Sequence, residues 1–149
     1  MRKLLATNDD IAPLIARVAV GGVIFAHGAQ KLLGWFGGKG WSGTMEFFTN
    51  WGFHPILVVL LILIESIGML LLVAGFGGRI WAALLSIVMV IAVIKARHYQ
   101  WFFLNWYAER RGEGFEYHIL VMAMAAIVLI LGSGKWSIDR LITARRSTA

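Results

Sequence analysis

The chain has 149 residues, of which 59% are hydrophobic, and its mean hydropathy of +0.74 is too high for an ordinary soluble domain. The net charge of +6 does not indicate a nucleic-acid partner, because the basic residues lie at the ends of apolar runs, where they meet lipid headgroups. Cysteine is absent, which excludes disulfides, thiol chemistry and cysteine-ligated metal centres. The composition predicts one transmembrane domain over residues 1–149, with the lipid bilayer as its main partner.

The first predicted membrane span covers residues 11–33 and has Asp10 as its helix N-cap. We interpret it as a retained helix, because no signal-peptide cleavage site follows it. Arg17 lies roughly two turns into this span and His27 lies nearer its other end, an unusual polar load for a transmembrane helix. Lys31 is expected at the interface, where its long side chain can reach the headgroups.

The second predicted span, residues 55–75, is apolar except for Ser66 and Glu65. Its helix is roughly 30 Å long, about the hydrocarbon thickness of a bilayer, so Glu65 is expected near the midplane. An ionisable group at this depth is costly and usually faces protein or water rather than lipid. Glu65 therefore requires a partner from another span.

Small residues on the first two spans predict close helix packing. Gly21 and Gly28 share one face of the first span with Arg17 at helical spacing. Gly68 lies one turn after Glu65 and leaves room for a neighbouring helix. Because these glycine faces exceed what one small bundle needs, we also expect a homo-oligomer.

Two further apolar segments predict a third span at residues 79–97 and a fourth at residues 115–131, followed by a basic tail at residues 135–149. Aromatic residues are frequent in the two long loops, at residues 34–54 and 98–114, and indicate short interfacial helices there. The predicted fold class is all-α, an integral membrane four-helix bundle. A slight excess of cations on the side of the termini favours cytoplasmic termini.

In order and spacing, the polar and glycine motifs resemble those of the DoxX family of small four-span bacterial membrane proteins, over nearly the whole chain. The matching motifs are Arg17, His27-Gly28, Lys31-Leu32, Glu65, Gly68, Gly75, residues 114–117 (GFEY) and residues 132–139 (GSGKWSID). The resemblance implies the bacterial inner membrane and a redox system, since relatives include the DoxD-type subunit of thiosulfate:quinone oxidoreductase and partners of oxidative-stress proteins. It therefore implies a quinone as the candidate cofactor and soluble redox enzymes as candidate partners.

Five polar residues form the predicted ligand-binding or polar site: Arg17, His27, Glu65, Glu116 and His118. Arg17 and Glu65 are expected to meet in antiparallel packing, directly or through one water. Such a pair either fixes helix register or forms part of a polar pocket or proton path. His27 and His118 are either satisfied core imidazoles or ligand-contacting groups. Their different predicted depths argue against a haem held by both, and the sequence predicts no metal site.

Three classes of function remain open at this point. The first is a membrane subunit of a quinone-linked or oxidative-stress redox system. The second is a non-catalytic scaffold that docks soluble redox enzymes through its basic tail. The third is a small-solute or proton-coupled transporter that uses Glu65. Any cavity is expected to open between the first and fourth spans toward the two long loops, with Glu65 at its floor and the aromatic residues 101–107 over its mouth.

Overall fold

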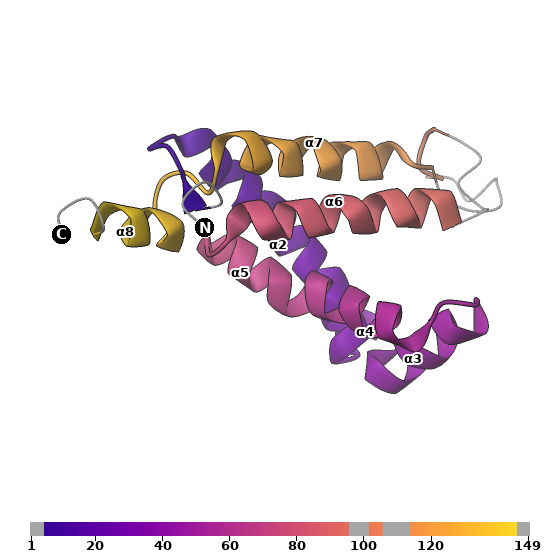
Figure 1. Ribbon diagram of the computed structural model, residues 1–149. Coiled ribbons are helices and arrows are strands. Elements are labelled where there is room, and N and C mark those ends of the chain that lie inside the picture. Colours follow the sequence, from indigo (N-terminus) through magenta and orange to yellow (C-terminus); the bar gives the residue numbers. More distant parts are fainter. Residues whose placement is uncertain (1–4, 96–101, 106–113, 146–149) are drawn as a thin grey trace.

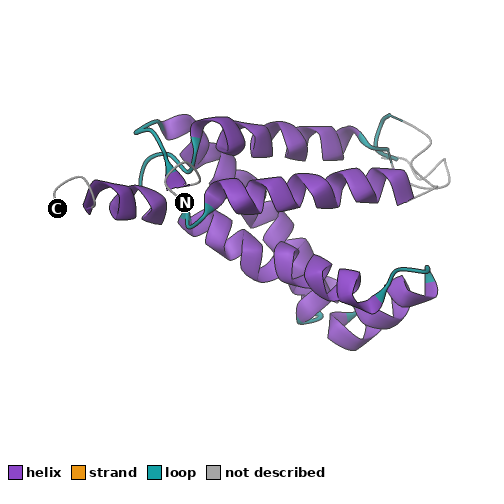
Figure 2. Ribbon diagram, in the orientation of Figure 1, coloured by secondary structure: helices purple, strands orange, loops and turns teal. Residues whose placement is uncertain are grey.

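The described part of the chain consists of helices and their connections, without a strand (Figures 1 and 2). The computed structural model describes residues 5–95, 102–105 and 114–145. Among these residues, three helical segments are long and apolar enough to cross a membrane: α2 (Ile11–Leu32), the second span (Pro55–Ala74) and α6 (Gly78–Lys95). A further apolar helix, α7 (Glu116–Leu131), is shorter. The predicted class, a helical membrane bundle, is confirmed.

The ends of the first two spans follow local sequence signals. The Asp10 side chain accepts a hydrogen bond from the amide of Ala12 at 3.4 Å, as predicted for an N-cap. Pro55 lies in the first turn of the second span, where its missing N–H is not needed. Gly75 ends this span with a φ of 69°, a left-handed conformation that glycine adopts at no steric cost. The short turn that follows places α6 antiparallel to the second span.

A π-helical turn interrupts the second span around Glu65. The three parts of the span are α4 (Pro55–Leu63), η2 (Ile64–Gly68) and α5 (Met69–Ala74). Single π-turns inside α-helices are frequent at functional sites, because the extra residue in the turn changes which side chains face a neighbour. The π-turn is thus the first structural feature that singles out Glu65.

The hydrophobic core lies where α2, the second span, α6 and α7 meet. α6 and α7 pack side by side, and α2 crosses the second span and α7 (Figure 1). The core residues are Ala16, Val20, Ile24, Met69, Leu72, Ala82, Leu85, Met89, Val121, Ala125 and Val128. The second span packs on α6 through α5 and η2, whereas α4 diverges from α6 toward α3 (Figure 1). This divergence leaves room for the cavity described below.

The first long loop contains a short helix, as expected for an interfacial segment. The turn η1 (Trp35–Gly37) leads into α3 (Gly40–Asn50), which packs against α2 and α4. Trp35, Phe36 and Trp41 are exposed, an arrangement typical of a membrane interface. The interfacial helix expected in the second long loop, and most of the aromatic cover at residues 101–107, fall outside the described residues.

A last helix, α8 (Ile138–Arg145), lies in the tail and was not predicted. It projects from the end of the bundle at which α2 begins (Figure 1). α3 lies at the opposite end of the molecule, so the bundle has a terminal end and a loop end.

Candidate functional site

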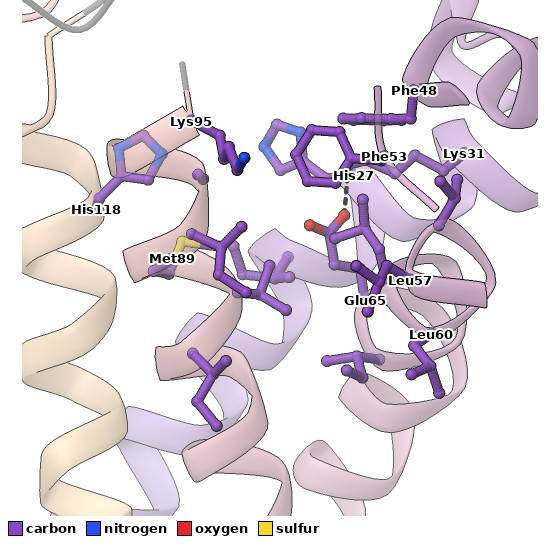
Figure 3. Close-up of a pocket in the computed structure, with 18 of the residues that line it drawn as sticks. His27, Lys31, Phe48, Phe53, Leu57, Leu60, Glu65, Met89, Lys95 and His118 are labelled. Atoms are coloured by element: carbon purple, nitrogen blue, oxygen red, sulfur yellow. Dashed lines mark hydrogen bonds and ion pairs between the residues drawn. The ribbon is translucent and has the colours of Figure 1, made fainter. Parts of the chain in front are cut away.

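Glu65 pairs with Lys31. Glu65 is a buried residue, 5% exposed, and Oε2 of its carboxylate accepts a hydrogen bond from Nζ of Lys31 (Figure 3). The side chain of Lys31 is itself partly buried. Gly28, one turn before Lys31, lets the backbones of α2 and η2 touch: an added Cβ at residue 28 would lie 2.5 Å from the backbone nitrogen of Ser66. Close backbone contact and the π-turn together place the ammonium and carboxylate side by side.

The predicted pair of Arg17 and Glu65 is therefore wrong. Arg17 and Lys31 lie about four turns, or roughly 21 Å, apart along α2, and Glu65 lies at the level of Lys31. Arg17 is buried and donates hydrogen bonds to four backbone carbonyls: those of Val73, Ser133 at 2.9 Å, Lys135 at 3.1 Å and Trp136 at 2.9 Å. Lys31 was expected at the interface, with its side chain toward the headgroups; the structure shows its ammonium against the carboxylate of Glu65.

Asp139 completes the cluster around Arg17. Its carboxylate accepts hydrogen bonds from the amides of Gly77 at 2.8 Å and Gly78 at 3.1 Å, and from the hydroxyl of Ser133 at 2.6 Å. Asp139 is 1% exposed, so these three donors satisfy a charge that burial would otherwise make costly. The cluster joins α2, the turn before α6 and the start of α8. It is a structural connection that closes the terminal end of the bundle.

A cavity of about 610 Å³ lies next to the ion pair, within the range of typical ligand pockets, about 300–1,000 Å³ (Figure 3). Its walls come from α2, α3, α4, η2, α6 and α7. Most of the lining is aliphatic or aromatic. The polar and ionisable residues in the lining are His27, Lys31, Trp51, Glu65, Lys95, Tyr117 and His118. An apolar chamber with a few convergent polar groups is the usual form of a small-molecule site.

Three of the five predicted site residues line this cavity: His27, Glu65 and His118. The ring of Tyr117 contacts both imidazoles edge to face, with centroid distances of 6.3 Å to His27 and 5.7 Å to His118. The buried hydroxyl of Tyr117 has no hydrogen-bond partner within the described ranges. Glu116 lies outside the cavity lining, and its carboxylate accepts a hydrogen bond from the amide of Leu104 at 3.1 Å.

The cavity reaches the loop end of the bundle, as predicted, since Phe53, Leu104 and Gly114 contribute to its lining. Most of its lining, however, comes from the second span and α6, and α2 and α7, the first and fourth spans, contribute fewer residues. The reason is the divergence of α4 from α6, which no sequence pattern indicates (Figure 1). Among the described residues, no group of three or more His, Asp or Glu side chains could hold a metal ion.

Sequence reasoning missed the roles of Lys31 and Asp139. Lys31 shares a helix face with Gly28, the point of closest contact with the second span, and this spacing was the available signal. Asp139 ends the motif at residues 132–139, but two of its three donors, the amides of Gly77 and Gly78, lie about sixty residues earlier in the chain, so no local pattern predicts them.

The fold and the site define a helical membrane protein with a buried ion pair beside an apolar cavity. The DoxX family model matches residues 12–98, more than half of the chain, and the protein belongs to the DoxX family. The chain is also similar to the protein described as "Putative oxidoreductase CatD" of Bacillus subtilis (strain 168), with 30% identity over 88 residues. These residues are 59% of this chain and 61% of the relative, so the chain spans about three fifths of the relative's length. No solved structure matches.

Proposed function

We propose that this protein is the quinone-binding membrane subunit of a redox system in the bacterial inner membrane, with both termini cytoplasmic. The observation that carries the proposal is the cavity of about 610 Å³ with the pair of Lys31 and Glu65 in its wall. In this proposal the chain supplies the quinone site, and a soluble redox enzyme at the terminal end donates or accepts the electrons. The description of the Bacillus subtilis relative as an oxidoreductase supports a redox role.

The polar groups suit both redox forms of a quinone. A quinone carbonyl accepts hydrogen bonds, and the ammonium of Lys31 can donate one. A hydroquinone hydroxyl donates, and the carboxylate of Glu65 can accept. The hydroxyl of Tyr117, buried and unpartnered among the described residues, can donate to one form and accept from the other.

The rest of the lining suits a flat apolar ring. Phe48, Trp51 and Phe53 line the cavity from α3 and the connection to α4, and their faces can stack on a quinone ring. His27 and His118 are the further polar groups within reach of a ring substituent. A strongly hydrated solute would lose its water against these walls, which is less compatible with the transporter alternative.

The test is binding of a tail-less benzoquinone to the purified protein, followed by quenching of tryptophan fluorescence, since Trp51 lines the cavity. Lys31→Met and Glu65→Gln are expected to weaken binding by about tenfold or more, because each removes a charged hydrogen-bonding group from the site. The matched controls are Lys39→Met and Glu46→Gln, which change exposed residues outside the cavity lining. Both controls are expected to bind like the unmodified protein.

Equal binding by all four variants would contradict the proposal. Failure of the unmodified protein to bind would also contradict it. In that case, loss of solute uptake in Glu65→Gln would indicate the transporter. Soluble enzymes that co-purify and are lost on removal of residues 140–149 would indicate the scaffold.

A further inference from the structure

The cavity has an open side between α4 and α6, which we call the window. Leu57 and Leu60 on α4 and Ile87 and Ile91 on α6 line the cavity, and roughly half of each residue is also exposed on the outside of the bundle. Because α4 diverges from α6 at this level, these residues edge an opening between the two helices and not a closed wall. In a membrane, this opening faces lipid, because all three long helical segments are apolar over the length of a span.

Two contacts mark the ends of the window. At the loop end, the ammonium of Lys95 lies 5.9 Å from the ring centroid of Phe53 and connects α6 to the start of α4. At the other end, Trp81 packs on Gly68 so closely that an added Cβ would lie 2.5 Å from the indole ring. Between Phe53 and Gly68 the window is roughly 22 Å long, at the usual rise per residue.

The polar groups and the window lie on different walls of the cavity. Lys31 and His27 belong to α2 and Glu65 to η2, while the aliphatic residues of the window belong to α4 and α6. In Figure 3, His27 and the ion pair lie between the ribbons of α6 and the second span. A molecule that reaches the ion pair through the window therefore has a polar end inside and an apolar end between α4 and α6.

We propose that the ligand enters from the bilayer through the window and is a quinone with a long apolar tail, which stays between α4 and α6 while the headgroup contacts Lys31 and Glu65. This inference rests on the proposed function and adds the tail and the route. The tail needs no polar partner, which matches the aliphatic residues of the window. A tail-less, water-soluble quinone would make no contact with these aliphatic side chains.

The ion pair favours an uncharged headgroup over the phosphate of an ordinary phospholipid. The charge of Lys31 is already balanced by Glu65, and a phosphate at this position would be repelled by the carboxylate. A quinone ring carries no charge and can use either member of the pair. Bulk phospholipid and a second copy of this chain are the other candidate occupants, and the experiment distinguishes them.

The experiment uses the full chain in lipid nanodiscs and measures displacement of a bound tail-less benzoquinone by the same benzoquinone carrying a decyl chain. Leu60→Trp fills the window. Its control is Leu63→Trp on the same helix, since Leu63 is 37% exposed, close to the 47% of Leu60, but does not line the cavity. Ile87→Trp fills the window from α6, with Ile94→Trp as its control. Size-exclusion chromatography and helical content confirm that each variant folds.

The tail-less quinone is expected to bind both control variants like the unmodified protein, and its own affinity for each window variant serves as the reference for the displacement in that variant. In Leu60→Trp and Ile87→Trp, displacement should require about tenfold or more of the decyl quinone, because the indole occupies the space of the tail and a steric cost of about 1.4 kcal/mol is a tenfold loss of affinity. Both control variants should behave like the unmodified protein. If one window variant does not fold, the other carries the test from the opposite helix.

Four results would overturn the inference. Unchanged displacement in both window variants would mean that the tail does not pass between α4 and α6, while the quinone site itself would stand. A dimer that dissociates in the window variants, with unchanged displacement, would assign the window to a second copy. Phospholipid that co-purifies and resists the decyl quinone would assign the window to bulk lipid. If the tail-less quinone does not bind the unmodified protein, the proposed function fails and this inference fails with it.

Discussion

The closest approach of two spans, at Gly28, gives the sharpest test of the structure. In Gly28→Ala, the new Cβ would lie 2.5 Å from the backbone nitrogen of Ser66 and nearer still to the carbonyl of Glu65. Ordinary van der Waals contact begins at 3.4 Å, so α2 and η2 must separate by about 1 Å. Backbone atoms cannot rotate away as a side chain can, and the shift therefore has to move whole helices.

The cost of this separation lies at the upper end for overpacked cores, about 3 kcal/mol. For a chain of this size, that loss corresponds to a decrease of roughly 6–12 °C in the apparent melting temperature, on the scale of soluble proteins. The matched control is Gly22→Ala on the same helix, where an added Cβ has nothing within 4 Å. Because alanine is the better helix former, by about 1 kcal/mol in water, the control should be neutral or slightly stabilising.

The assay is thermal unfolding of both variants in the same detergent, followed by helical circular dichroism and by loss of the monodisperse peak. A melting temperature of Gly28→Ala within the error of Gly22→Ala would refute the close contact between α2 and η2. It would also remove the stated reason why Lys31 and Glu65 meet.

Three further predictions concern the buried polar groups. Lys31→Met or Glu65→Gln alone should lower the free energy of unfolding by about 3 kcal/mol, because each single change leaves an unpaired charge. The double variant should lose less than either single variant, and additive losses in a double-mutant cycle would contradict the ion pair. Asp139→Asn should lower the free energy of unfolding by about 2 kcal/mol or more, because it weakens three buried hydrogen bonds. Its control, Asp9→Asn in an exposed ion pair, should lower it by less than about 1 kcal/mol, and equal losses would be inconsistent with the buried cluster. Arg17→Lys should lower the melting temperature by several degrees, since an ammonium has three donors and cannot satisfy the four carbonyls that the guanidinium contacts. An unchanged melting temperature would argue against those contacts.

Several residues of the candidate site could be predicted from the sequence, but the ion pair that they form could not. Glu65 stands out because it is one carboxylate in an apolar run, and His27 and His118 stand out for similar reasons. The partner of Glu65 depends on helix register: the observed register sets Glu65 level with Lys31, about four turns of α2 away from Arg17. The π-turn at residues 64–68 and the contact at Gly28 set this register, and both arise from packing.

The sequence by itself determined the membrane class and the limits of the first two spans, because hydropathy, N-caps, Pro55 and Gly75 act within a few residues of chain. Only the tertiary structure decided where the cavity lies and what surrounds Arg17 and Asp139. The cavity exists because α4 diverges from α6 on the loop-end side of the contact between Gly68 and Trp81. The carbonyls around Arg17 come from segments far apart in the chain, such as those of Val73 and Ser133. Such features depend on how whole helices pack against one another, which local patterns do not encode.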